Sequence, residues 1–339
     1  MAARTFAENF PDVMLIHDDI KNISTLQLQG LIADGETDLI IGGPPCQSYT
    51  TIGKRKYDDK ARLYNEYQRM LSIIRPRMFL FENVKGMLSM RNETGQLIIE
   101  EIGEKFNNLG QGPGYRIAHQ VIDAANYGVP QHRERVFIIG IREDEDIEWD
   151  FPPVTHGNED GLHPYLTLEQ AISDLPDVNP GLGVLEYTLD PANNYQALMR
   201  FGSERLTEHF AAIHGDKIQT VINHVVPGEG KDYINGLVDQ GVLAEQYRLT
   251  SGYKNTYGRL IANQPATTIT NNLATPSGLR CIHYEFNRAL TPREGARIQS
   301  FPDRFTFCGY KTHVTSQIGN AVPPLLADAL ARHIEQLLD

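Results

Sequence analysis

Three segments of the sequence place a nucleophile, an acid and two cations beside apolar runs. A Gly-Gly-Pro-Pro turn closes the first run and presents Cys46, and the next run leads into Glu82 and Asn83. The third run is entered through Arg133 and Arg135. A thiol near a carboxylate is suited to nucleophilic catalysis with general acid help. Two arginines at i and i+2 of a strand share a face and could bind a carbonyl or a phosphate.

Each segment taken alone has an ordinary structural explanation. A buried, inert cysteine is commoner than a reactive one, Glu82 would simply end a strand, and the two arginines would form a salt-bridged sheet edge. The two prolines before Cys46 stiffen the approach to the thiol. The chemical interpretation therefore depends on all three segments meeting in one place.

Apolar patterns over residues 1–142 predict alternating strands and helices, and hence a mainly parallel sheet with helices on both faces. The carboxyl ends of its strands would gather Cys46 and Glu82 at one edge. The expected strands are Val13–Ile16, Asp38–Ile41, Met78–Phe81, Arg116–Ile122 and Arg135–Ile141. The expected helices are Leu63–Ile74 and Leu97–Leu109.

The rest of the chain divides at two changes of pattern. Residues 143–285 carry frequent Pro and Gly with weak periodicity, which predicts a second domain of irregular structure. Residues 286–339 return to helical patterns at Thr291–Gln299 and Pro324–Leu338. We expect this last part to complete the domain formed by residues 1–142.

The ordered segments resemble the catalytic motifs of the DNA cytosine-C5 methyltransferase family, of bacterial restriction-modification type. The resemblance continues through residues 288–303 and ends at Gln317–Pro323. It implies an α/β, Rossmann-like doubly wound fold that depends on S-adenosylmethionine, with residues 143–285 as a target-recognition domain. The implied reaction transfers a methyl group to C5 of a cytosine flipped out of duplex DNA.

The resemblance also implies a role for each catalytic candidate. Cys46 would add to C6 of the base, and Glu82 would bind the exocyclic amine and N3. Arg135 would hold the O2 carbonyl, Arg133 would support the site near the thiol, and Asn83 would fix the loop that carries Cys46. The base that removes the C5 proton is not assigned to any side chain.

Two further sets of residues follow from the resemblance. The Lys54-Arg55-Lys56 cluster would contact DNA phosphates, although the formal net charge of −12 taken alone argues against nucleic-acid binding. For the methyl donor, the resemblance implies that Asp19 and Ile20 contact the adenine ring. Pro45 and Leu63 would line the donor pocket, and Asn320 and Ala321 would close this pocket from the C-terminal side.

Composition excludes several other classes of protein. No run of about 18 apolar residues predicts a membrane span, and the first residues lack a signal-peptide pattern. The three cysteines show no metal-ligand spacing, so we expect no metal. A cytoplasmic protein, of a prokaryotic or viral host cell, is the simplest interpretation.

The start of the chain lacks a feature that the family has. No Phe-x-Gly-x-Gly loop for the methionine part of the donor precedes Val13–Ile16, and two strands of the expected sheet are missing, which would leave a gap before Leu39–Ile41. Three explanations stay open: a partner chain supplies the segment, the sequence begins within a longer protein, or the gene product is truncated. Under each explanation, we expect this chain by itself to bind the methyl donor weakly.

Two other functions compete with DNA methylation. One branch of the family methylates tRNA cytosine, but its Cys-Phe-Thr signature is absent here. A catalytically silent or partner-dependent DNA-binding subunit is favoured by the missing donor residues. The intact set of Cys46, Glu82 and Arg135 argues against it, because a silent protein has no need of all three.

Overall fold

The computed structural model describes residues 1–32, 36–44, 63–110, 112–254 and 256–339. Its strands are β1 (Leu39–Gly42), β2 (Met78–Val84), β3 (Tyr115–Asp123) and β4 (Glu134–Arg142). Its helices are α1 (Ala2–Asn9), α2 (Thr25–Leu31), α3 (Tyr64–Ile74), α4 (Ile98–Asn107), α5 (Leu168–Ile172), α6 (Asn194–Arg200), α7 (Asp216–His224), α8 (Lys231–Asp239), α9 (Pro292–Ile298), α10 (Lys311–Asn320) and α11 (Pro324–Leu338).

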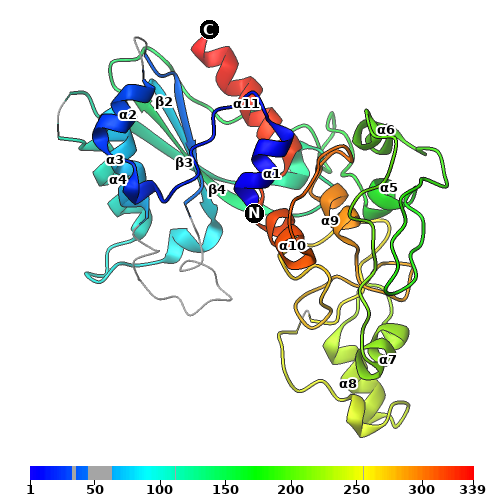
Figure 1. Cartoon of the computed structure of the whole chain (residues 1–339). Coiled ribbons are helices and arrows are strands. Elements are labelled where there is room, and N and C mark those ends of the chain that lie inside the picture. The colour runs from blue at the N-terminus through cyan, green and yellow to red at the C-terminus, as the bar shows by residue number, and fades with distance from the viewer. Residues whose placement is uncertain (33–35, 45–62, 111, 255) are drawn as a thin grey trace. The chain divides into compact units, whose positions relative to one another are not determined.

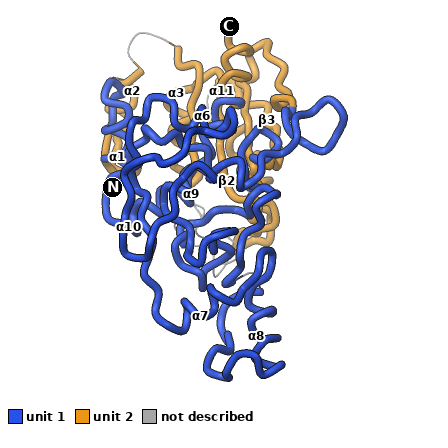
Figure 2. Tube along the Cα trace, turned by 90° about the vertical axis from the view of Figure 1, so that its right-hand side faces the viewer, with its two compact units in different colours: residues 1–15, 124–133, 154–329 blue, residues 16–123, 134–153, 330–339 orange. Residues whose placement is uncertain are grey.

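The described residues form two compact units, coloured separately in Figure 2. The first unit comprises residues 1–15, 124–133 and 154–329, and the second comprises residues 16–123, 134–153 and 330–339. Residues 286–329, which we expected to complete the domain of residues 1–142, belong by their contacts to the first unit. No helix among the described residues is long and apolar enough to cross a membrane.

Four strands of the second unit form one mixed sheet in the order β1-β2-β4-β3 (Figure 1). Strand β1 runs parallel to β2, with Leu39 opposite Met78. Strand β2 is antiparallel to β4, with Val84 opposite Arg135, and β4 is antiparallel to β3. The sheet therefore brings the carboxyl end of β2 beside the amino end of β4.

Helices α3 and α4 cover one face of this sheet (Figure 1). The Tyr67 hydroxyl of α3 lies 3.0 Å from the carbonyl oxygen of Ile40 and 3.1 Å from that of Leu80, so one side chain ties the helix to both β1 and β2. The buried core between helices and strands comprises Tyr64, Tyr67, Leu71, Ile98, Ile102 and Phe106 with Phe79, Phe81, Tyr115, Val136 and Ile138.

The expected parallel direction is wrong for one of the four described strands, because β4 runs opposite to β1, β2 and β3. Since β4 lies between β2 and β3, β1 and β2 are the described strands that pair in parallel. Between β3 and β4 lie residues 124–133, which begin with the 3-10 turn Ala124–Tyr127 and contain no α-helix. A parallel crossover needs a dozen or more residues, usually with a helix, so these two strands return as an antiparallel pair.

The expected strand Val13–Ile16 is also wrong. These residues form no strand, and their side chains are exposed, Met14 to 78% and Val13 to 52%. A short apolar run becomes a strand only where neighbouring strands satisfy its backbone groups. No described strand pairs with this run.

Buried ion pairs hold the first unit together around α9. The Arg288 guanidinium binds both carboxylate oxygens of Glu294, at 2.9 and 2.8 Å, and both side chains are buried. Glu294 Oε2 also accepts a hydrogen bond from the backbone N–H of Thr291, which completes the capping box of α9. Burial by itself raises the pKa of Glu294, but the facing Arg288 lowers it to about 2.

We expect the substitution Glu294→Gln to lower the free energy of unfolding at pH 7 by about 3 kcal/mol, because Arg288 would lose its buried counter-charge and keep Asp177, which lies 3.0 Å away and is 52% exposed. The folded pKa lies below the ordinary value of 4.5. The carboxylate therefore stabilises the fold above that value, and its contribution disappears as the pH falls towards 2.

Denaturant unfolding of both proteins at pH 7 and at pH 3 tests this expectation. The difference between wild type and variant should be smaller at pH 3. Glu285→Gln, at an exposed position in the same segment, is the control and should change the free energy of unfolding by no more than about 0.5 kcal/mol. An equal difference between wild type and Glu294→Gln at both pH values would contradict the assignment.

Candidate active site

Glu82 and Arg135 form an ion pair where β2 ends and β4 begins. Glu82 lies opposite Phe137, and Arg135 lies opposite Val84, so the two side chains are diagonal neighbours on one face of the sheet. Glu82 Oε1 lies 3.2 Å from Arg135 Nε, and the side chains are 20% and 15% exposed. This arrangement places an acceptor and a cation together at a partly open sheet edge.

The turn that follows β1 passes directly beside the Glu82 carboxylate. A Cβ atom added at Gly43 would lie 3.2 Å from Glu82 Oε2, so the turn approaches this closely because the residue lacks a side chain. The buried Asn83 donates from Nδ2 to the carbonyl oxygen of Pro44 at 3.3 Å. Asn83 therefore fixes the backbone of this turn next to Glu82.

Five predicted site residues lie outside the described part of the chain. They are Pro45, Cys46, Lys54, Arg55 and Lys56. The described turn ends at Pro44, two residues before Cys46.

Arg133 is a buried structural cation of the first unit. Strand β4 begins at Glu134, so Arg133 precedes the strand and the expected sharing of a strand face with Arg135 does not apply. Its guanidinium donates to the carbonyl oxygens of Ile269, at 3.0 Å, and Gly319, at 2.8 Å. These bonds join three segments that are far apart in the sequence.

Gln131 reinforces the same junction, and the sequence analysis did not single it out. Its amide oxygen accepts from the Ile269 backbone N–H at 2.8 Å, and its amide nitrogen donates to the Ile298 carbonyl oxygen at 3.1 Å. A glutamine two residues before an arginine gives no sequence signal of burial, because its partners are backbone groups of distant segments.

Three of the residues that are predicted to contact the methyl donor belong to the second unit. The exposed Asp19 accepts the Lys21 backbone N–H at 3.0 Å and so caps the 3-10 turn Ile20–Asn22. The Ile20 carbonyl oxygen accepts from Arg69 Nη2 of α3 at 2.7 Å. Leu63 is half-buried and directly precedes α3.

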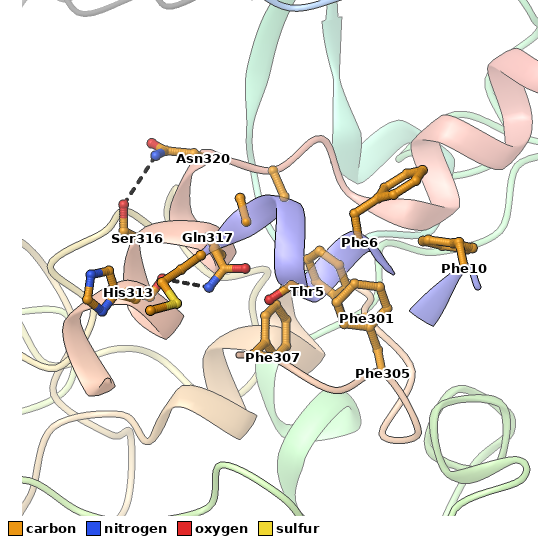
Figure 3. Close-up of a pocket in the computed structure, with 13 residues that line it drawn as sticks. Thr5, Phe6, Phe10, Phe301, Phe305, Phe307, His313, Ser316, Gln317 and Asn320 are labelled. Atoms are coloured by element: carbon orange, nitrogen blue, oxygen red, sulfur yellow. Dashed lines mark hydrogen bonds between the residues drawn. The ribbon is translucent and has the colours of Figure 1, made fainter. Parts of the chain in front are cut away.

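Asn320 and Ala321 are also predicted to contact the methyl donor. They line a pocket of about 460 Å³ in the first unit (Figure 3). Asn320 ends α10, and its amide donates to the Ser316 hydroxyl at 3.4 Å. The remaining lining residues are Met1, Ala2, Thr5, Phe6, Phe10, Phe301, Phe305, Phe307, His313, Ser316 and Gln317.

The aromatic wall of this pocket was not predicted from the sequence. Phe6 and Phe10 come from the first ten residues, whereas the facing Phe305 follows α9. The side chain of Asn9 joins the two segments, donating to the Thr306 carbonyl oxygen at 2.7 Å and accepting the Thr306 N–H at 3.0 Å. Phe6 lies in α1 and Phe10 directly follows this helix, but nothing local in the sequence indicates their partner.

A sequence profile described as C-5 cytosine-specific DNA methylase matches residues 1–336. The chain belongs to this family. The type II methyltransferase M.DdeI of Desulfomicrobium norvegicum is 34% identical over 98% of this chain and 80% of its own length. M.AgeI of Thalassovita gelatinovora, also a type II methyltransferase, is 31% identical over 98% of this chain and 91% of its own length.

A solved structure agrees with these relatives. A DNA modification methyltransferase encoded within a prophage of E. coli superimposes with a TM-score of 0.74 at 25% identity, covering 99% of this chain and 90% of that one. The protein is thus a DNA cytosine-5-methyltransferase of restriction-modification type, as the resemblance implied. Among the described residues, no group of three or more His, Cys, Asp or Glu side chains could hold a metal ion.

We expect Gly43→Ala to slow methyl transfer by about tenfold or more while changing stability little. The new methyl group would press on the Glu82 carboxylate, and small displacements of catalytic groups cost up to about 100-fold in rate. Single-turnover methylation of duplex DNA measures this effect. The matched control is Gly103→Ala in α4, where a Cβ meets no atom within 4 Å. Equal rates for the two variants would show that the turn does not constrain Glu82.

Proposed function

We propose that this enzyme methylates a cytosine flipped out of duplex DNA, through a covalent bond between Cys46 and C6 of the base. The observation that supports this proposal is the Glu82–Arg135 pair beside the turn that leads to Cys46. Flipping removes the base from its stack at a cost of a few kcal/mol. A base delivered to this sheet edge would meet a carboxylate and a guanidinium, and in this proposal Cys46 supplies the thiol.

The chemistry follows from the weak nucleophilicity of C5. The Cys46 thiolate adds to C6, which forms an S–C6 bond and moves the ring electron pair towards C5. Glu82 supplies a proton to N3 and accepts a hydrogen bond from the exocyclic amine, so the negative charge that addition builds is neutralised. Arg135 stabilises the O2 carbonyl.

The reaction then releases the Cys46 thiolate and returns the N3 proton to Glu82. C5 takes the methyl group, a base removes the C5 proton, and the electrons of that C–H bond restore the ring double bond as the S–C6 bond breaks. Asn83 keeps the turn before Cys46 in place through Pro44. Arg133 acts indirectly, because its bonds to Ile269 and Gly319 hold in place the segment that enters β4.

S-adenosylmethionine supplies the electrophilic methyl group. The residues present fit such a donor, because the pocket of about 460 Å³ at Asn320 and Ala321 has the size of a small-molecule site and aromatic walls such as Phe301 for an adenine ring. Asp19, Ile20, Leu63 and Pro45 remain the proposed contacts from the rest of the chain.

A covalent trap tests the mechanism. Duplex DNA with 5-fluorocytosine at its cytosines keeps the adduct, because the C5–F bond blocks the final elimination. With S-adenosylmethionine present, mass spectrometry should find the DNA attached to the peptide that contains Cys46. No adduct, even with an added N-terminal segment, would favour a silent DNA-binding protein.

The substitution Cys46→Ser separates chemistry from binding. It should abolish the adduct and methylation while leaving the affinity for duplex DNA within about threefold, because the thiol makes few ground-state contacts. Methylation by the variant would remove Cys46 from its role. If the wild type methylates tRNA but not duplex DNA, the proposed substrate is wrong and tRNA takes its place.

A further inference from the structure

A second pocket, of about 480 Å³, lies in the second unit on the face of the sheet opposite to α3 and α4. Ile139 and Ile141 of β4 line it, and so does Ala118 of β3, which lies directly opposite Ile139. Ile147 and Trp149, which follow β4 in the chain, also line it. A concave and largely apolar cavity of this size is typical of a site for a small molecule.

This pocket is separate from the Glu82–Arg135 pair. Side chains alternate along β4, so Arg135, Ile139 and Ile141 share one face of the sheet. Ile139 follows Arg135 at i+4, which corresponds to about 13 Å along a strand. The register places Ile141 opposite Met78, where β2 begins, and Glu82 lies near the other end of β2. The pocket therefore lies towards the end of the sheet that is remote from the ion pair.

Trp149 contributes a hydrogen-bond donor to this part of the fold. Its ring makes edge contacts with Phe151, at 5.4 Å between ring centroids, and with His333 of α11, at 5.2 Å. The Nε1 atom of Trp149 is buried and has no hydrogen-bond partner among the residues that the structure describes. Because a buried N–H group without a partner is destabilising, an acceptor atom in the adjoining pocket would be bound favourably.

Two carboxylates line the pocket without a counter-charge. Asp146 and Glu148 are both exposed, and neither forms an ion pair within the described part of the chain. The acids just before them are engaged, because Asp144 and Glu145 pair with Arg142 at 2.6 and 2.9 Å. A negative charge beside an aromatic wall favours a ligand that carries a positive charge.

Arg116, which also lines the pocket, is bonded to the backbone of the segment that follows β4. Its Nη2 atom donates to the carbonyl oxygen of Glu145 at 3.1 Å and to that of Ile147 at 2.6 Å. These bonds tie β3 to the segment that leads to Trp149, and so they fix that wall of the pocket. One guanidinium against two carboxylates leaves the described pocket residues with an excess of one negative charge.

We propose that this pocket binds a small heteroaromatic amine, in which a flat ring carries a hydrogen-bond acceptor and an attached nitrogen is positively charged. The ring lies against the isoleucine side chains and Trp149, and its acceptor takes the Trp149 N–H. The positive nitrogen faces Asp146 and Glu148. Each feature of the ligand thus answers a separate feature of the pocket: its apolar walls, its unpaired donor and its two carboxylates.

Trp149 is the only tryptophan of the chain, so its signal reports on this pocket alone. The full chain labelled with ¹⁵N-tryptophan gives one indole N–H resonance, against which 4-(aminomethyl)pyridine is titrated. This probe has a ring acceptor and an ammonium group. It should move the indole proton downfield and saturate with a Kd of about 1 mM, a usual strength for so small a ligand. Benzylamine lacks the ring acceptor, so it should bind at least about threefold more weakly and give no downfield shift.

The acid pair is tested by combining Asp146→Asn and Glu148→Gln in one protein, which should weaken binding of the probe about fivefold or more. The control combines Glu159→Gln and Asp160→Asn, the same change of charge at two exposed acids of the first unit, and should leave the Kd unchanged. Ala118→Leu extends an exposed residue of β3 into the pocket. It should abolish the shift while keeping the melting temperature.

Three results would overturn the proposal. The first is an indole resonance of Trp149 that stays in place up to about 10 mM probe, or that moves equally with benzylamine. The second is an equal Kd for the two double variants. The third is a shift that survives in Ala118→Leu, because the probe would then bind elsewhere. No DNA enters this experiment, so its failure would leave the proposed function untouched.

Discussion

The antiparallel pairing of β2 with β4 is the constraint on which the site depends. It sets Val84 opposite Arg135, so the Glu82 carboxylate and the Arg135 guanidinium meet diagonally at the sheet edge, 3.2 Å apart. A shift of register by one residue would send one of the two side chains to the opposite face. The closely packed turn at Gly43 then adds a third wall, because a side chain at this position would press on the carboxylate.

A second constraint operates inside the first unit, around Arg133. Burying a guanidinium is costly unless it is hydrogen-bonded, and here Nη1 and Nη2 donate to the carbonyl oxygens of Ile269 and Gly319. Gln131 binds the backbone of the same Ile269. Residues just before β4 are thereby bonded to two segments that lie far away in the sequence. The buried Arg288–Glu294 pair stabilises the helix α9 that packs within the same unit.

The apolar patterns predicted β2, α3 and α11 well, because each is a long buried run or a regular helical stripe. They failed at Val13–Ile16, where a strand needs neighbours that a local pattern cannot supply. They failed again for the direction of β4, which the short connection from β3 decides. The type and order of Glu82 and Arg135 were visible in the sequence. The bonds of Arg133 and the Asn9 bond beside the aromatic pocket were not, because they join residues 136 to 297 positions apart.

The central claim is that Glu82 and Arg135 act on the base as one unit, and a double-mutant cycle in methyl transfer tests it most directly. Single-turnover rates on duplex DNA would be measured for wild type, Glu82→Gln, Arg135→Ala and the double variant. The account predicts that the double variant is about as slow as the slower single variant, because groups that act together are not additive. Rate losses that multiply across the two single variants would contradict it, because they would mean that the two side chains act independently.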